Sequence, residues 1–431
     1  MKIVKRFSDS ANKMFMNSKK FKSYLILFAI LILCNTTAFC NDVVRVVRHK
    51  DGVWLMTVNN RPYFIKGIAY NSEAIGISNP DTNKWMWEDT DNNGKPDGPY
   101  DAWVDLNRDN YQDISENAVG DFALLKAMGC NTIRVYHSEH VNKDLLYDLY
   151  RRFGIRVIMG NFFGAYTKGS GASWHTGTDY TDKKQKKNML ESVRTMIEEF
   201  KDEPYILMWM LGNENDTEGN TVNSTATRTN AAKKPEAYAK LLEEACQMIK
   251  ELDPNHPVGV CNATTKLVKY FAKYTPSIDV LGFNQYNGPY GFGTLWNRIK
   301  QEYDRPVLIT EYGCDAWNEN KKTTNEAYQA NYHKSNWKDI ENNSYWGDKA
   351  GNSIGGVAFC WLDKWWLVGS PKVHDTLLGA WKGSTIDSLF NDEWLGICSQ
   401  GNGRKSPFQR ILRRVYFTYQ EELWDWNPAT Y

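Results

Sequence analysis

Short apolar runs of strand length alternate along this chain with segments whose apolar residues recur every three or four positions. Uninterrupted apolar runs are typical of strands that are buried on both faces of a parallel sheet. We expect eight such strands, at residues 62–71, 130–137, 155–161, 206–214, 257–262, 279–286, 306–311 and 356–361. Two shorter runs, 43–47 and 53–58, flank a turn and predict a β-hairpin ahead of the first of them.

The segments between these strands have the period of amphipathic helices. We expect helices at residues 119–128, 142–153, 186–200, 235–252, 265–274, 295–303, 326–341 and 407–423. Eight strand-then-helix units predict an α/β protein with a single (β/α)8 TIM barrel. A doubly wound sheet has the same alternation, but no glycine-rich phosphate loop follows the first strand.

Two connections are longer than ordinary loops. Residues 72–116 follow the first barrel strand, and residues 362–406 follow the last and carry four tryptophans. Long loops at the C-terminal end of a barrel are usually functional, so we expect both to shape a substrate cleft. The predicted organisation is therefore an N-terminal β-hairpin at residues 41–62 and a barrel at residues 63–431.

The first 40 residues have the composition of a targeting segment. They carry seven Lys or Arg and one Asp, and an apolar run at 24–33 is followed by small residues at positions 38 and 40. That run is short for a membrane span, so we expect a secretory signal peptide. The protein is then secreted, periplasmic or at the cell surface, and a membrane becomes a partner only if the segment is retained as an anchor.

Composition after residue 40 narrows the classes of partner. The remainder has a net charge of about −5 and no basic stripe, so nucleic acid is not expected as a partner. Six cysteines remain without metal-ligand spacing, and buried free thiols are the expectation, with one disulfide left open. Aromatic residues make up 14% of the chain, and exposed tryptophans are candidate platforms for sugars.

Two of the predicted strands end on a glutamate. Leu211-Gly-Asn213-Glu214 closes one apolar run, and Ile309-Thr-Glu311 closes another. Barrels of this class keep their chemistry at the C-terminal ends of the strands. Two carboxyl groups placed there are suited to cleavage of a glycosidic bond.

In these motifs the chain resembles the clan A retaining glycoside hydrolases, over roughly residues 63–366. The resemblance implies that Glu311 is the nucleophile and Glu214 the acid/base, and that Asn213 binds the sugar 2-hydroxyl. It also implies that Arg134 holds Glu311 ionised and that Tyr286 donates its hydroxyl to the same carboxylate.

Two further positions complete the expected sugar-binding set. By the same resemblance Trp361 forms the floor of the −1 subsite. His137 lies near the end of the second strand and is a candidate to line that subsite, although it could instead satisfy a neighbouring carbonyl. An oligo- or polysaccharide is therefore the expected substrate, with no organic cofactor.

Placement within the clan rests on three further stretches, at 64–70, 121–136 and 281–286. They resemble family 2 type barrel domains and, equally, the β-1,3-glucanosyltransferases. About twenty residues lie between the predicted signal peptide and the first barrel strand, which favours a stand-alone barrel acting on a β-glucan. A transglycosylase with the same site and a non-catalytic glycan-binding barrel remain alternatives.

The first long insertion contains two acidic runs with the spacing of calcium loops. The second run offers oxygen ligands at alternate positions, so we expect structural Ca²⁺ held by Asp105, Asn107, Asp109, Tyr111, Asp113 and Glu116. Asn110 stands where this loop type prefers glycine. The first run, at 89–100, has the glycine but ends in a tyrosine. A solvated acidic loop is the alternative.

Overall fold

The computed structural model describes residues 42–77, 83–217, 227–367, 369–376, 381–382 and 385–426. The predicted signal peptide lies outside the described residues. No helix among the described residues is long and apolar enough to cross a membrane.

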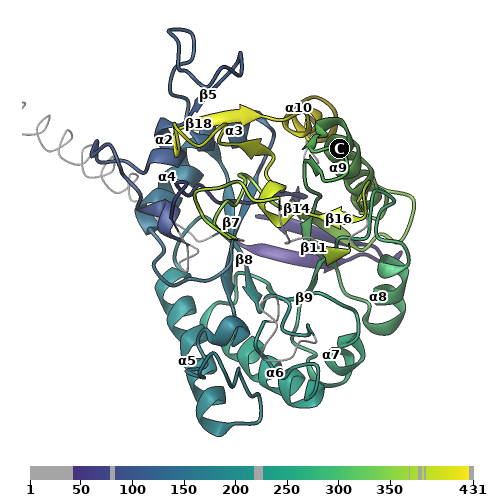
Figure 1. The fold of residues 1–431 in the computed structure, drawn as a ribbon. Helices are drawn as coiled ribbons and strands as arrows, with labels where there is room; N and C mark the ends of the chain where they lie inside the picture. The colour runs from purple at the N-terminus through teal and green to yellow at the C-terminus, as the bar shows by residue number, and fades with distance from the viewer. Residues whose placement is uncertain are drawn as a thin grey trace, which may run out of the picture. The chain divides into compact units, whose positions relative to one another are not determined.

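Eight parallel strands close into a barrel, which confirms the predicted (β/α)8 fold (Figure 1). In barrel order the strands are β4 (Ile65–Ala69), β6 (Thr132–Val135), β7 (Arg156–Asn161), β8 (Ile206–Leu211), β9 (Val258–Asn262), β10 (Val280–Asn284), β11 (Val307–Tyr312) and β14 (Ser353–Ala358). All but the first residue of β7 are buried, so both faces of each strand are covered, as their apolar runs require.

Helices surround the barrel and bury their apolar faces against it. They are α3 (Asp121–Ala127), α4 (Lys143–Phe153), α5 (Lys183–Phe200), α6 (Pro235–Leu252), α7 (Val268–Tyr274), α8 (Leu295–Tyr303) and α9 (Glu326–Asn342). Helix α5 shows the principle, because Met189, Val193 and Met196 recur at helical spacing and are buried. Asp182 caps its first turn by accepting a hydrogen bond from the Gln185 N–H over 2.8 Å.

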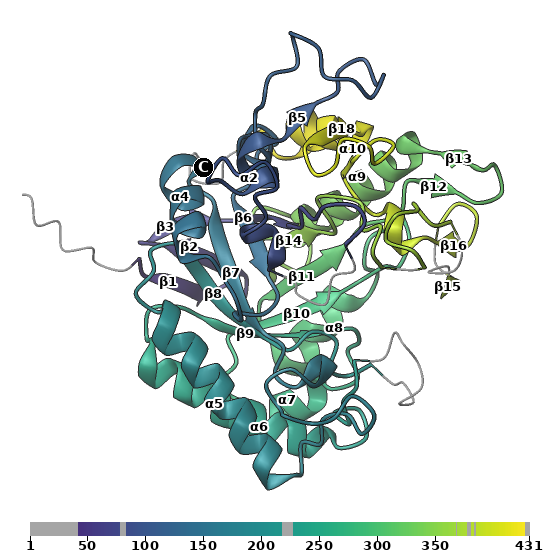
Figure 2. The same cartoon turned by 60° about the vertical axis from the view of Figure 1, so that its left-hand side comes forward.

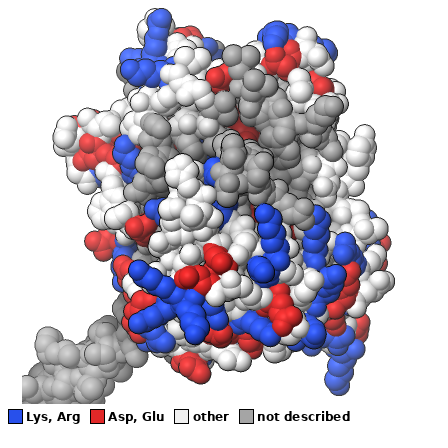
Figure 3. Space-filling model, turned by 60° about the horizontal axis from the view of Figure 1, so that its bottom comes forward, with Lys and Arg blue, Asp and Glu red and all other residues white. Residues whose placement is uncertain are grey.

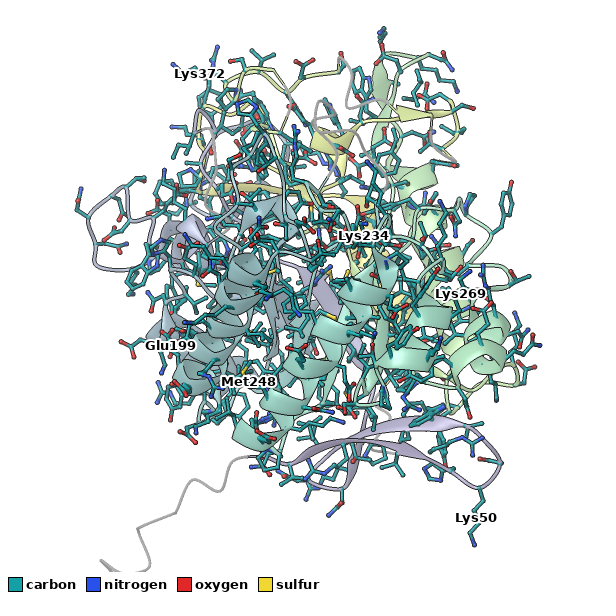
Figure 4. The ribbon with its side chains drawn as sticks, turned by 90° about the horizontal axis from the view of Figure 1, so that it is seen from below. Lys50, Glu199, Lys234, Met248, Lys269 and Lys372 are labelled. Carbon is teal, nitrogen blue, oxygen red and sulfur yellow. The ribbon has the colours of Figure 1, made fainter. Side chains whose placement is uncertain are left out.

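An antiparallel sheet covers the N-terminal end of the barrel. It contains the two predicted hairpin strands, β1 (Val44–Arg48) and β2 (Trp54–Val58), and a third, β3 (Arg61–Tyr63). The apolar side chains of Val44 and Met56 join the core inside the barrel. In Figure 4 Lys50, in the turn between β1 and β2, lies at the opposite end of the molecule from Lys372, in the loop after β14.

Two predicted elements at the C-terminal end of the chain were wrong in their bounds. The last barrel strand runs over 353–358 instead of 356–361, and the chain then leaves the barrel wall. The expected helix at 407–423 begins as a strand, β18 (Gln409–Leu412), which pairs in parallel with β5 (Trp103–Val104) of the first insertion. Helix α10 (Arg414–Thr418) and a π-helical turn (Tyr419–Leu423) follow it.

Both long insertions lie after the C-terminal ends of barrel strands. The first contains a 3-10 turn (Lys84–Met86) and a short helix, α2 (Asp97–Asp101). The second contains β15 (Trp381–Lys382), β16 (Leu389–Phe390), a 3-10 turn (Asp392–Trp394) and β17 (Cys398–Ser399). Figure 2 shows β15 and β16 beside β12 (Trp317–Asn318) and β13 (Thr323–Thr324), which follow β11. These segments therefore frame one side of the barrel mouth.

Candidate active site

Glu214 stands three residues beyond the last residue of β8, on a tight turn. Gly212 takes a φ of +75°, and Glu214 itself takes a φ of +56°, a region that non-glycine residues rarely adopt. The strained backbone is fixed through the Glu214 carbonyl oxygen, which accepts hydrogen bonds from the hydroxyls of Thr217 (2.7 Å) and Thr227 (3.0 Å). Strain held in this way is typical of functional positions.

Glu311 lies within β11, one residue before its end, and its carboxylate is surrounded by donors. Arg134 Nη1 lies 3.1 Å from Oε1, and the Tyr136 hydroxyl donates to the same oxygen over 2.7 Å. The Tyr286 hydroxyl donates to Oε2, also over 2.7 Å. Glu311 is 6% exposed. One cation and two hydroxyl groups therefore complement a negative charge on this carboxylate.

The second guanidinium nitrogen of Arg134 ties the β8 side of the site to β11. Arg134 Nη2 donates to Asn213 Oδ1 over 2.9 Å, and Arg134 itself is 2% exposed. Asn284, the last residue of β10, donates from Nδ2 to the same oxygen over 3.2 Å and to Glu214 Oε1 over 2.8 Å. A continuous hydrogen-bonded layer therefore joins the two glutamates across the barrel mouth.

The two carboxyl groups have different surroundings. Among the described residues, the Glu214 carboxyl accepts one hydrogen bond, from Asn284, and the residue is only partly exposed. Burial, followed by the nearby Glu311 carboxylate, raises the pKa of Glu214 to about 7. A carboxyl group with such a pKa holds its proton at mildly acidic pH and gives it up readily near neutrality.

Sequence reasoning missed three residues of this layer. Tyr136 lies two positions after Arg134 and so projects from the same face of the chain, and Asn284 stands two positions before Tyr286 in the same way. That alternation was the signal that could have found them. Tyr166 was not detectable from spacing, because its hydroxyl reaches Asn213 Nδ2 over 3.2 Å from an irregular turn.

His137 lies beside the site and is mostly buried, with 6% of its surface exposed. Its Nδ1 accepts a hydrogen bond from the Phe162 N–H over 3.3 Å, and the two rings stack with their centres 5.2 Å apart. The histidine therefore supports the loop after β7, and a role in lining the subsite stays a prediction.

The expectation for Trp361 was wrong in its position. The side chain is 0% exposed and belongs to the core between barrel and helices, where its ring lies 6.3 Å from that of Tyr416. The chain leaves the barrel after Ala358, three residues earlier, so the indole turns outward and offers no free face to a sugar. Phe359, next to Ala358, instead packs beside Tyr286 with ring centres 6.4 Å apart.

Two tryptophans of the second insertion, Trp365 and Trp394, stack on the same histidine. The His374 ring lies between Trp365 and Trp394, at centre distances of 4.6 Å and 3.5 Å. Trp394 is covered on its other side by Trp317 at 4.6 Å. The side chain of Trp381 lies outside the described part of the structure. This column stiffens the loop, and the faces of its inner rings are covered by other side chains of the protein.

The two acidic runs of the first insertion share one feature of backbone conformation. In both, the residues at loop positions 4 and 6 have positive φ: Asn92 (57°) and Gly94 (84°) in the first, Arg108 (61°) and Asn110 (66°) in the second. Asn110 therefore adopts a conformation in which glycine is preferred but which asparagine tolerates.

The carboxylates among the predicted second-loop ligands accept hydrogen bonds from the loop itself. Glu116 Oε1 accepts from the Leu106 N–H, and the Asp113 carboxylate accepts from Ser115. Within the described residues, three acidic side chains bring their oxygens within 4.8 Å of one another only in the first loop, at Asp89, Asp91 and Asp97. Calcium binding stays a prediction for both loops.

A closed parallel barrel that carries one glutamate beyond β8 and another at the end of β11 is the architecture of a glycoside hydrolase. Residues 112–345, more than half of the chain, match the family described as glycosyl hydrolases family 2, TIM barrel domain. The chain therefore belongs to glycoside hydrolase family 2, a family of clan A retaining enzymes, as the motifs predicted.

Solved structures of similar fold include uronide-cleaving enzymes. A β-D-glucuronidase of Dictyoglomus thermophilum is 16% identical with a TM-score of 0.54, and the match covers 90% of this chain and 54% of that one. A β-galacturonidase of Eisenbergiella tayi is 18% identical with a TM-score of 0.52, at the same coverage. A β-glucuronidase of Bacteroides uniformis is 17% identical with a TM-score of 0.53, covering 88% of this chain and 37% of that one. This chain thus spans about half of these proteins or less, and at such identity the likeness shows the fold.

Proposed function

We propose that this protein hydrolyses β-glycosidic bonds with retention of configuration, with Glu311 as nucleophile and Glu214 as acid/base. The observation that carries the proposal is the contrast between the two carboxyl groups. Glu311 is held by Arg134 and two tyrosine hydroxyls, whereas burial raises the pKa of Glu214 to about 7. Two carboxyls with opposite environments are the requirement of double displacement.

In the first step the Glu311 carboxylate attacks the anomeric carbon and forms a glycosyl ester. The glycosidic C–O bond breaks, and Glu214 transfers its proton to the departing oxygen. In the second step Glu214 takes a proton from water, the water oxygen bonds to the anomeric carbon, and Glu311 leaves as a carboxylate. In this proposal Asn213, which accepts hydrogen bonds from Arg134 and Asn284, binds the sugar 2-hydroxyl during both steps.

The substrate we expect from the sequence is a β-linked glucan. The test is a reducing-end and chain-length assay on the mature chain, with β-1,3-, β-1,4-, β-1,6- and mixed-linkage glucans, mannan, galactan and uronic acid polymers. Shorter products support hydrolysis and identify the linkage, whereas products longer than the substrate would indicate transglycosylation with the same glutamates. Binding without any product would favour a glycan-binding barrel.

We also propose that the protein is exported, since residues 1–40 have the pattern of a signal peptide. Expression of the full chain followed by N-terminal sequencing of the exported product tests this proposal. A new N-terminus near residue 41 supports cleavage, and an intact chain recovered with membranes would indicate a retained anchor.

A further inference from the structure

Two cations near the candidate active site have no anionic partner among the residues that the structure describes. Arg228 is 9% exposed, and its Nε and Nη1 atoms are buried without a hydrogen-bond partner. Within the described part of the chain, no ion pair or hydrogen bond reaches any of its three nitrogens. Its guanidinium instead lies over the ring of Trp174, 4.6 Å from the ring centre, and Trp174 is 46% exposed.

This lack of a partner distinguishes Arg228 from the other buried arginines that the structure describes. Each of those is paired with a carboxylate at 3.1 Å or less, namely Arg134 with Glu311, Arg410 with Asp121 and Arg413 with Asp363. A buried cation without a partner is costly, and such a cost is kept where a ligand supplies the missing anion.

Arg228 lies on the side of the site that carries Glu214. The neighbouring residue, Thr227, donates its hydroxyl to the Glu214 carbonyl oxygen over 3.0 Å, so Arg228 is anchored beside that turn. The Arg228 carbonyl accepts from the Thr178 N–H over 2.7 Å, which ties it to the loop that contains Trp174. Since Glu214 faces the departing oxygen in the proposed mechanism, Arg228 and Trp174 lie on the leaving-group side.

The second unpaired cation is Lys364, in the loop after β14. It is 9% exposed, and its ammonium lies over the ring of Phe359 at 4.1 Å from the ring centre. Among the described residues its Nζ atom has no hydrogen bond or ion pair. The other buried lysine, Lys66, donates to the Trp424 carbonyl over 2.9 Å. Phe359 packs beside Tyr286, whose hydroxyl binds Glu311.

The two cations stand on opposite sides of the barrel mouth. Strands β8 and β14 are four places apart in the closed ring of eight, so the loops that follow them face each other across the mouth. The hydrogen-bonded layer with Glu214 and Glu311 lies between them. A glycan bound across the mouth would thus meet one cation on each side of the bond that is cleaved.

We propose that the substrate is an acidic glycan, and that Arg228 with Trp174 and Lys364 with Phe359 bind its anionic groups on the two sides of the glutamate pair. In each case an aromatic ring lies under the cation, which suits a sugar that has an apolar face and an anionic substituent. Carboxylate and sulfate esters share the chemistry that a guanidinium and an ammonium recognise. This inference rests on the proposed function, because that function defines the two sides.

The test measures binding separately from turnover. A Glu311→Gln variant of the mature chain is titrated calorimetrically with β-1,4-glucuronan oligosaccharides, with cello-oligosaccharides of the same length, and with cello-oligosaccharides sulfated at O6. The first two probes have the same linkage, and they differ in that each sugar carries a carboxylate in one and a hydroxymethyl group in the other. We expect one anionic probe to bind at least about tenfold tighter than the neutral one at low salt, with the preference weakening as salt rises.

Adding Arg228→Met and Lys364→Met together should abolish this preference. A matched control is Lys186→Met with Lys187→Met, in a lysine-lined groove between α5 and α6 outside the mouth. Figure 3 shows the face that carries these helices, where basic and acidic side chains are mixed. Equal affinity for all three probes, no binding of either anionic probe, or a preference that survives in the double variant would each overturn the inference.

Two further readouts separate the possible failures. A structural role for the cations predicts a lower Tm in the double variant, and a lower Tm with retained preference would overturn the inference. If the two cations instead serve ligand binding, removing their unpaired buried charges should leave the Tm unchanged or raise it. Reducing ends released only from neutral probes by the unmutated protein would leave the proposed function standing without the acidic substrate. Preferential binding of the anionic probes without any turnover would support the acidic ligand and contradict the proposed function.

Discussion

The Asn284 amide donates a hydrogen bond to the Glu214 carboxyl over 2.8 Å and is the hydrogen-bond donor that reaches this group from the barrel wall. The bond favours the ionised form and so opposes the effect of burial, which raises the pKa of Glu214 to about 7. Asn284 therefore sets how far the pKa of the candidate acid rises, and it does so from the strand next to the one that carries Glu311.

The first prediction concerns the pH dependence of activity. Because Glu214 must hold a proton to act as acid, kcat/KM should fall as pH rises through about 7. Asn284→Ala removes the hydrogen bond that lowers this pKa, so the alkaline limb should move to higher pH while the maximal rate decreases. A pH–rate profile of both proteins measures the shift, and an alkaline limb at the same pH in both would contradict the assignment.

The second prediction concerns stability, and its sign follows from the same group. The pKa of Glu214 is raised from 4.5 in a free side chain to about 7 in the folded protein. Below pH 4.5 both states hold the proton and the group costs nothing. Between pH 4.5 and 7 the unfolded chain loses its proton first, so the folded state is increasingly disfavoured, by up to about 3 kcal/mol above pH 7.

Glu214→Gln cannot ionise and escapes this cost. We expect it to match the unmutated protein near pH 4 and to be more stable at pH 8, in denaturant unfolding followed at both pH values. Glu191→Gln, on the exposed face of α5, controls for the loss of one negative charge. A gain of equal size at both pH values would contradict the prediction.

The third prediction concerns the two hydroxyls that hold Glu311. Tyr136→Phe and Tyr286→Phe each remove one hydrogen bond to the carboxylate and leave the ring in place. Hydrogen bonds to charged groups contribute about 1.5–3 kcal/mol, so each variant should lose roughly 10- to 100-fold in kcat/KM. Tyr290→Phe, at a tyrosine that is 90% exposed, should leave the rate unchanged. Full activity in both site variants would show that neither hydroxyl acts on the nucleophile.

The sequence predicted the barrel because each of its strands is a buried apolar run, and burial on both faces leaves a pattern that needs no tertiary information. Its failure at the C-terminal end has a physical cause. Strand β18 is stabilised by pairing with β5, some 300 residues earlier in the chain, and local periodicity carries no trace of such a partner. The helix predicted at residues 407–423 was therefore placed too far toward the N-terminus at its start.

The same distinction separates the site residues. Arg134 and Tyr286 were found through the resemblance of their motifs to clan A enzymes, and it carried over because both stand in or next to barrel strands, where position fixes direction. Trp361 was misplaced because the chain leaves the barrel after Ala358, and three residues of irregular backbone reversed the side chain's direction. Arg228 and Lys364 lie in loops, and their lack of ionic partners among the described residues is visible only when the whole fold is assembled.

The fourth prediction follows from the position of Trp361. Trp361→Ala empties a site in the core, so the free energy of unfolding should fall by about 3–5 kcal/mol. In the milder Trp361→Phe we expect reduced stability with KM unchanged, because the indole is 0% exposed and does not reach substrate. Trp87→Phe, at a tryptophan that is 59% exposed, is the matched control. A raised KM with unchanged stability in Trp361→Phe would instead support the predicted role of Trp361 as the floor of the −1 subsite.

The last prediction concerns calcium in the first insertion. Both loops there place carbonyl and carboxylate oxygens at calcium-loop spacing, and Asp89, Asp91 and Asp97 already lie within 4.8 Å of one another. If a cation neutralises them, EGTA should lower the Tm, and added Ca²⁺ but not Mg²⁺ should restore it. Asp89→Ala should remove the response if the first loop holds the ion, whereas Asp105→Ala should remove it if the second does. The hypothesis is falsified if EGTA leaves the Tm unchanged in protein that carried calcium beforehand by elemental analysis. A response that persists in both variants would place the ion elsewhere in the protein.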